Sequence, residues 1–135
     1  WLLRLSEQTA TESDAAAPAR ARAHVTRFIE LVDADYSRQA PLDDYAARVG
    51  ISAAHLNALC RQVTGHSALS IIHARLMREA RRMLVYTSMT IRDISDVLGF
   101  SDPAYFTRFF KRSAGLSPRE FRHRAASFNT ANVHT

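Results

Sequence analysis

The sequence is poor in cysteine, glycine and proline, and it contains no long apolar run. A single cysteine, Cys60, excludes an internal disulfide and is typical of a reducing compartment. Only four glycines and four prolines interrupt 135 residues, and no stretch approaches the roughly 18 to 20 apolar residues that a membrane span requires. With 47% hydrophobic residues the chain can still bury one or two small cores. We therefore expect a cytoplasmic protein without a membrane partner.

Positive charge is concentrated in the part of the chain after residue 44. Residues 1–44 contain five arginines against eight acidic residues, whereas residues 45–135 contain thirteen basic against five acidic residues. Lys111 is the one lysine among the 18 basic residues, and arginine favours bidentate contacts to phosphate or guanine. This distribution is typical of a surface that binds nucleic-acid phosphates. A solvated basic surface without any partner is the alternative.

One pattern occurs twice. The first copy consists of Gly50-Ile51-Ser52, three apolar helix positions and Gly65-His66-Ser67. The second copy has the same order, with Gly99-Phe100-Ser101, three apolar helix positions and Gly115-Leu116-Ser117. From the first of these apolar positions onward, the two copies align at a constant offset of 50: Leu56, Leu59 and Cys60 match Phe106, Phe109 and Phe110. Each copy predicts a helix, a glycine turn and a second amphipathic helix, which is the helix-turn-helix unit. Two such units in one chain suggest that two adjacent DNA grooves are read.

Helical periodicity extends over most of the chain, and no segment predicts a strand. We expect an all-α fold of about seven helices, with two helix-turn-helix subdomains joined by a linker helix. The predicted helices cover residues 22–36, 42–48, 53–63, 68–86, 91–98, 103–114 and 118 onward. Ser52, Thr90, Asp102 and Ser117 are the expected N-caps. Val63 is expected to point inward with Leu56, Leu59 and Cys60.

The predicted domain organisation has five parts. Residues 1–20 are rich in alanine, threonine and serine and lack a periodic apolar face, so they are interpreted as a linker or the tail of a preceding domain. The first helix-turn-helix subdomain covers 21–67, the linker helix 68–88 and the second subdomain 89–126. Residues 127–135 are expected to form a frayed tail.

The second copy carries a family signature. The run Ile91-x-x-Ile94-x-x-x-x-Gly99-Phe100-x-x-x-x-Tyr105-Phe106-x-Arg108-x-Phe110-Lys111-x-x-x-Gly115-x-Ser117-Pro118-x-x-Phe121-Arg122 closely resembles that of the AraC/XylS transcription regulators. Arg75-Leu76-x-x-Glu79-Ala80-x-x-Met83-Leu84 is similar to the family's linker helix, and the resemblance covers about residues 22–124. Two positions depart from it. Ser95 replaces the usual alanine and Cys60 the usual phenylalanine, which puts local stability in doubt.

The resemblance implies a bacterial, sequence-specific DNA-binding regulator, and its subgroup implies an activator. Double-stranded DNA is the expected partner, and RNA polymerase is a further one. The resemblance also implies that a small-molecule effector acts only through a missing N-terminal domain, so that this chain is the C-terminal part of a longer polypeptide.

The helix faces identify candidate DNA-binding residues. If Leu56 and Phe106 point inward, the opposite faces of the two recognition helices carry the side chains that can reach bases. Asn57 is the expected reader of adenine, alanines can contact thymine methyl groups, and Arg112 is expected to contact phosphate. For Arg61 and Arg108 base and phosphate contacts stay open, and Thr107 and Lys111 can also belong to a solvated face. The full candidate set is Ala53, Ala54, Asn57, Ala58, Arg61, Ala104, Thr107, Arg108, Lys111 and Arg112.

No catalytic or metal site is expected. The six histidines are scattered, without an i,i+4 pair or a cysteine partner for zinc. We therefore expect neither enzymatic activity nor a cofactor. The alternative function is a helical hub that binds only proteins, since the alanines at 53, 54 and 58 would also suit helix packing.

Overall fold

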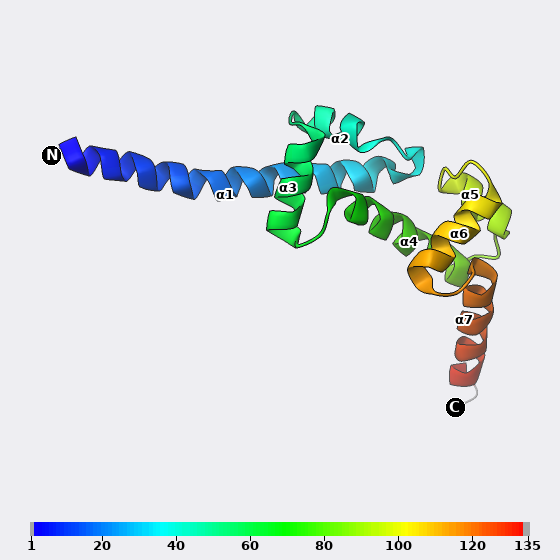
Figure 1. Ribbon diagram of the computed structural model, residues 1–135. Coiled ribbons are helices and arrows are strands. Elements are labelled where there is room, and N and C mark those ends of the chain that lie inside the picture. Colours follow the sequence, from blue (N-terminus) through cyan, green and yellow to red (C-terminus); the bar gives the residue numbers. More distant parts are fainter. Residues whose placement is uncertain (1, 134–135) are drawn as a thin grey trace. The chain divides into compact units, whose positions relative to one another are not determined.

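The computed structural model describes the backbone of residues 2–133 and the side chains of residues 16–128. This part of the chain forms seven α-helices, one short 3-10 helix and no strand, which confirms the predicted all-α fold (Figure 1). No helix among the described residues is both long and apolar enough to cross a membrane. The helices are α1 (Leu2–Asp35), η1 (Tyr36–Arg38), α2 (Leu42–Val49), α3 (Ala53–Thr64), α4 (Ala68–Tyr86), α5 (Ile91–Val97), α6 (Pro103–Ala114) and α7 (Pro118–Val133).

The helices group into two compact units. Within the described residues, the first unit contains residues 2–34 and 40–71, and the second contains 35–39 and 72–133. Each unit therefore holds one of the two helix-turn-helix copies, α2–α3 in the first and α5–α6 in the second. The sequence pattern predicts a separate linker helix at residues 68–88. In the structure α4 contributes its first turn to the first unit and the rest of its length to the second.

The first unit packs α2 and α3 against the C-terminal half of α1. Phe28 of α1 and Tyr45 of α2 are both fully buried, and their rings meet edge to face with centroids 5.6 Å apart. Leu56 and Cys60 of α3 complete this core without any exposed surface. Gly50 ends α2 with a positive φ of 96°, and its N–H donates to the carbonyl of Ala46 at 2.8 Å.

The second unit is built around aromatic rings. Phe100, in the turn after α5, lies with its ring centroid 5.1 Å from that of Phe106 and 5.2 Å from that of Phe109. Phe110 contacts Phe106 on one side and Phe121 of α7 on the other. Phe106 and Phe110 are fully buried. The aromatic side chains of this copy therefore form a core and are not stacking platforms for bases.

A short segment, residues 35–39, packs onto the second unit although the chain enters it from the first. We call this segment the strap. The guanidinium carbon of Arg75 lies 4.4 Å from the ring centroid of Tyr36, and Gln39 Nε2 donates to the carbonyl of Leu98 at 2.8 Å. The sequence analysis had placed the strap in the first subdomain; its contacts here lie in the second unit.

Three expectations about elements were wrong. The first helix begins at Leu2 and not near Arg22, so that it contains Pro18, whose ring removes one backbone donor from the helix. The last helix continues through Val133, beyond the predicted end at residue 126. Val63, expected to point inward, keeps 38% of its surface exposed near the end of α3. A polar, alanine-rich segment can be helical without an apolar face, since alanine has the highest helix propensity.

Ser95 bears out the doubt raised about its position. Its side chain is fully buried in α5, and its hydroxyl is the one buried side-chain polar atom without a hydrogen-bond partner among the described residues. Burying an unpaired hydroxyl costs about 1–3 kcal/mol. This serine therefore lowers the stability of the second unit relative to the alanine that the family usually has.

We expect Gly99→Ala to destabilise the second unit far more than Gly50→Ala destabilises the first. Both glycines have positive φ, which alone costs an alanine about 1–2 kcal/mol. A Cβ on Gly50 would meet nothing within 4 Å, whereas one on Gly99 would lie 1.8 Å from the carbonyl oxygen of Ser37 in the strap. Overlap with backbone should raise the loss for Gly99→Ala to about 3 kcal/mol or more.

Urea unfolding together with amide hydrogen exchange of each unit would measure this difference. Gly50→Ala is the matched control, because it changes the same backbone conformation without the overlap. Equal losses for the two variants would mean that the strap does not press on the turn at Gly99.

Candidate nucleic-acid interface

The helix α3 is oriented by one buried face. Ser52 caps it by accepting the N–H of His55 at 3.1 Å, and Leu56, Leu59 and Cys60 are buried beneath it. The opposite face carries Ala54, Ala58 and Arg61, all exposed, with Ala53 half-buried at the start. This face is small and has one cation, so it can approach another molecule closely.

Asn57, the predicted reader of adenine, has a structural contact. Its amide oxygen accepts the N–H of Ala68, the first residue of α4, at 3.0 Å, and the side chain is half-buried. Since the donor is a backbone N–H, only the oxygen of the amide can accept it. Bidentate pairing with adenine uses both the oxygen and the nitrogen of the amide, so the oxygen of Asn57 would have to accept from adenine with its second lone pair while it keeps the bond to Ala68.

The repeat explains why Asn57 is needed there. At the offset of 50 residues, Asn57 corresponds to Thr107 and Ala68 corresponds to Pro118. Proline has no N–H, so the first turn of α7 has one donor fewer to satisfy than the first turn of α4. Both helices otherwise begin alike, with Ser67 and Ser117 each accepting an N–H at 3.1 Å. The sequence shows that Pro118 lacks an N–H, but it does not show that Asn57 is the acceptor for the N–H of Ala68.

The helix α6 presents the more strongly basic face. Asp102 caps it by accepting the N–H of Tyr105 at 2.7 Å, and Pro103 occupies its first position. Three phenylalanines are buried on its inner side. The outer side carries the exposed candidates Ala104, Arg108, Lys111 and Arg112, with Thr107 half-buried. The guanidinium of Arg108 lies 6.0 Å from the ring centroid of the exposed Tyr105.

The arginines of α4 divide into two pairs. Glu79 is buried and accepts hydrogen bonds from both Arg75 and Arg82, and these hydrogen bonds, that from Arg82 first, hold the pKa of its carboxyl below the usual range against its burial. Arg78 and Arg81 are exposed and form no ion pair among the side chains that the structure describes.

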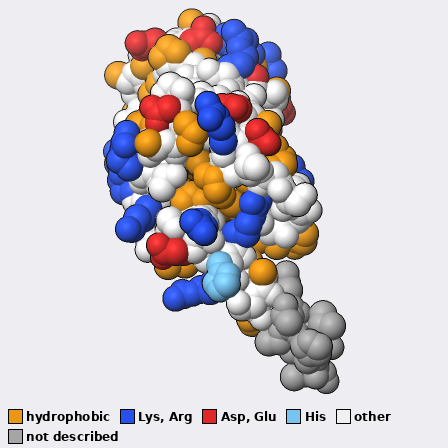
Figure 2. Space-filling model, turned by 90° about the vertical axis from the view of Figure 1, so that its right-hand side faces the viewer, with side chains coloured by type: hydrophobic (Ala, Val, Ile, Leu, Met, Phe, Trp, Pro, Cys, Tyr) orange, Lys and Arg blue, Asp and Glu red, His pale blue; other side chains and the backbone are white. Residues whose placement is uncertain are grey.

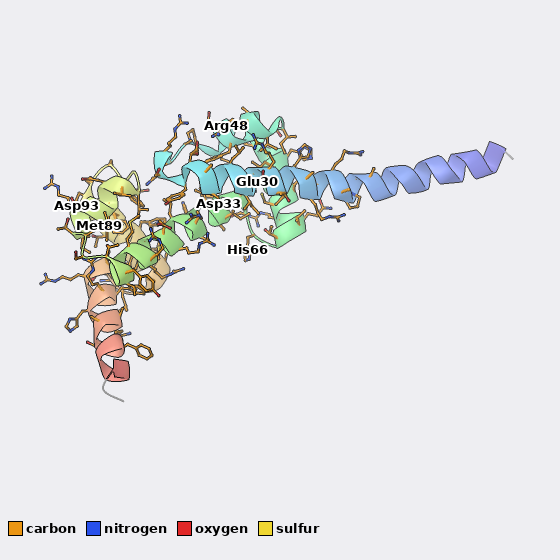
Figure 3. The ribbon with its side chains drawn as sticks, turned by 180° about the vertical axis from the view of Figure 1, so that it is seen from behind. Glu30, Asp33, Arg48, His66, Met89 and Asp93 are labelled. Carbon is orange, nitrogen blue, oxygen red and sulfur yellow. The ribbon has the colours of Figure 1, made fainter. Side chains whose placement is uncertain are left out.

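Arg122 was part of the family signature, but the sequence gave no hint of its role. Its guanidinium, on α7, donates to the carbonyls of Leu84 at 3.0 Å and Met89 at 2.5 Å, and more weakly to those of Met83 and Thr87. These carbonyls belong to the end of α4 and the segment between α4 and α5, where Figure 3 labels Met89. One side chain therefore bonds the carbonyl of Leu84 in the last turn of α4 together with carbonyls of the segment that follows it.

The face of the molecule drawn in Figure 2 carries acidic, basic and hydrophobic side chains mixed together. It offers no continuous basic surface. Among the described residues there is also no group of three or more histidine, cysteine or acidic side chains that could hold a metal ion. The exposed faces of α3 and α6 are therefore the best candidates for an interface.

His73 of α4 lies close to the basic end of α6. Its ring meets that of Phe109 edge to face with centroids 5.1 Å apart. Burial against this neighbour, and secondly the positive charge of Arg112, lower the pKa of His73 below 6.5. The folded protein therefore disfavours the charged imidazolium relative to the unfolded chain.

We expect the stability of the second unit to fall as the pH drops below about 6.5, the unfolded-state value for histidine. Between that value and the lower folded pKa of His73, the unfolded chain binds more protons than the folded chain, so acid favours unfolding. His73→Gln should flatten this part of the stability curve, and Arg112→Gln should flatten it in part. Thermal unfolding between pH 5 and 8 measures both. A curve unaffected by His73→Gln would contradict the assignment.

We expect Asn57→Ala to cost about 1 kcal/mol of stability in the first unit, because it leaves the N–H of Ala68 without its acceptor. Asn57→Asp, which keeps an acceptor oxygen, should lose less. The matched control is Thr107→Ala, which faces a proline and should show no such loss. Denaturant unfolding of the three variants measures the difference, and an equal loss for Asn57→Ala and Thr107→Ala would refute the capping role.

Comparison with known proteins identifies the type of domain. Residues 45–124 match a family model described as a helix-turn-helix domain, and this range contains both copies of the repeat. The chain is 32% identical over 131 residues to the HTH-type transcriptional regulator GlxA of Rhizobium meliloti, a match that covers 94% of this chain and 40% of that protein. It is 39% identical over 77 residues to the arabinose operon regulatory protein of Escherichia coli, covering 57% of this chain and 26% of that protein.

Solved structures give the same result for the fold. A transcriptional regulator of Chromobacterium violaceum with an AraC-type DNA-binding domain is 28% identical, with a TM-score of 0.70 and coverage of 80% of this chain and 96% of that one. The DNA-binding domain of AdpA in complex with a target DNA is 20% identical, with a TM-score of 0.71 and coverage of 76% and 93%, and shows the fold alone. The chain spans 40% or less of the curated relatives named above.

Proposed function

Because this chain belongs to the AraC/XylS family of helix-turn-helix proteins, we propose that it is the sequence-specific DNA-binding part of a bacterial transcription regulator. In this proposal α3 and α6 enter successive major grooves of a promoter site. The observation that carries it is the matched pair of amphipathic helices, each with three residues buried on one side and exposed small or cationic residues on the other. That geometry suits helices that lie in a groove.

The two helices have different parts in the proposed interface. On α3 the exposed Ala54 and Ala58 permit close approach and contact with thymine methyl groups, and Arg61 supplies a cation. On α6 the exposed Arg108, Lys111 and Arg112 supply three cations. Asn57 has a double role in this proposal, since its amide oxygen also accepts the N–H of Ala68 and so fixes the orientation of the side chain.

Activation of transcription is the mode that we propose for the whole protein. One relative, 30% identical over 99 residues, is the lactose operon transcription activator of Staphylococcus xylosus, and this chain covers 36% of it. In the proposal an effector acts on a part of the protein outside this chain, and the DNA-bound regulator contacts RNA polymerase. The competing function is a helical hub that binds only proteins.

We expect the chain to bind duplex DNA with an affinity that falls steeply with salt. About six cationic contacts to phosphates predict a slope of about −5 for log K against log salt concentration. A binding site can be selected from random duplexes and the slope measured by fluorescence anisotropy. Two boxes about 10 base pairs apart should emerge, and a five-base-pair insertion between them should abolish tight binding, since it turns one box to the other side of the duplex.

A scrambled duplex of the same length is the control, because it keeps the phosphates and removes the boxes. A flat salt dependence would remove the DNA-binding proposal in favour of the hub. Unchanged affinity after the insertion would mean that one copy alone reads DNA.

A further inference from the structure

A cavity that is open to solvent lies between α1 and α3 in the first unit. Its volume is about 470 Å³. Its polar lining consists of Arg20 and His24 from α1 and His55 and Gln62 from α3. Leu59, which is buried, lies among them, and no acidic side chain contributes to the lining.

The unpredicted start of α1 builds one wall of this cavity. Pro18 and Arg20 precede Arg22, where the sequence pattern placed the beginning of the helix. If α1 began at Arg22, the cavity would lack the guanidinium of Arg20. The opposite wall is formed by residues 55, 59 and 62, which share one face of α3 at a spacing of four and three residues.

The lining matches an anion in chemistry. A guanidinium is always charged and donates from a planar fork, imidazoles donate through ring N–H groups, and the Gln62 amide donates through its nitrogen. Arg20 and His55 form no ion pair with any side chain that the structure describes, residues 16–128. A phosphodiester, with two anionic oxygens, is the anion that a DNA-binding domain meets most often.

The position on α3 points to the DNA backbone as the source of that phosphate. An α-helix with its side chains is about 10–12 Å across and the major groove is about 12 Å wide, so the flanks of a helix in the groove face the two phosphate strands. At about 100° per residue, His55 and Gln62 lie on a flank next to the exposed face of Ala54, Ala58 and Arg61.

We propose that the cavity between α1 and α3 is a phosphate clamp, in which Arg20, His24, His55 and Gln62 hold one backbone phosphate of the duplex that receives α3. The clamp deepens the proposed function and rests on it. It contributes affinity and register without reading a base, and it brings the middle of α1 into the DNA-binding surface.

The first test compares two arginines on the same helix. Arg20 and Arg22 are both exposed on α1, but only Arg20 lines the cavity. Removing one phosphate contact makes the salt slope shallower by about 0.9, which corresponds to about an eightfold loss of affinity at 0.1 M salt. We expect this change for Arg20→Gln and little change for Arg22→Gln, measured by anisotropy on the selected duplex and on its scrambled counterpart.

The loss should be the same on both duplexes, since a phosphate carries no sequence. Circular dichroism should show equal helix content in both variants, and His55→Ala combined with Gln62→Ala gives a second variant from the opposite wall. If Arg20→Gln and Arg22→Gln behave alike, the clamp is overturned while the proposed function stands. If the parent chain binds no duplex at all, both fall.

The second test locates the phosphate. Duplexes with a single uncharged methylphosphonate linkage are scanned along the site with the parent chain and with Arg20→Gln. At the clamped position the parent should lose affinity by about the same factor as Arg20→Gln does, and Arg20→Gln should lose nothing further. If the uncharged linkage lowers the affinity of Arg20→Gln as much as that of the parent chain at every position, a direct contact between Arg20 and the backbone is contradicted.

A third arm separates DNA from a free anion as the source. Inorganic phosphate is added to the chain without DNA, and the imidazole signals of His24 and His55 are followed by NMR. Shifts that saturate at low millimolar phosphate, together with DNA binding that ignores Arg20→Gln, would make the cavity a site for a free anion and would overturn the clamp.

Discussion

The second unit depends on the bonds that one guanidinium makes to backbone carbonyls. A helix ends with carbonyl groups that have no partner in the helix, and α4 ends at Tyr86 with no glycine to close it. Arg122 supplies the donors from α7, so the last helix of the unit is joined to the first. The segment that leads into α5 is held by the same group. Arg122 therefore fixes the point at which the chain leaves α4 and turns toward α5.

The two units have the same arrangement of helices but fill their cores with different side chains. Around α6 the interior consists largely of tilted and edge-to-face phenylalanine rings, while around α3 two leucines and a cysteine fill the corresponding positions. The first unit compensates with the Phe28 and Tyr45 pair, donated by α1 and α2. The strap adds a further asymmetry, since it buttresses only the turn at Gly99. The repeat in the sequence thus describes a shared backbone more than a shared core.

The sequence predicted whatever depends on local periodicity and capping. The buried Leu56, Leu59 and Cys60 of α3, the inner face of α6, the caps at Ser52, Thr90 and Asp102 and the extent of α4 were confirmed, whereas Val63 was not. What it could not predict were contacts between residues distant along the chain, such as those of Gln39 and Arg122, because no pattern within a helix encodes its neighbours. The start of α1 was missed for another reason: an alanine-rich segment without an apolar stripe carries no periodic signal.

The bond between Asn57 and Ala68 has a consequence for how such a domain can change its target over evolutionary time. In the first copy the middle of the recognition helix doubles as the acceptor for the next helix, so a new side chain there must also satisfy a backbone donor. In the second copy the corresponding residue, Pro118, has no backbone N–H, so Thr107 has no such donor to satisfy. A substitution at position 57 therefore carries a cost in stability that a substitution at position 107 does not. The middle of α6 tolerates a change of side chain more readily than the middle of α3.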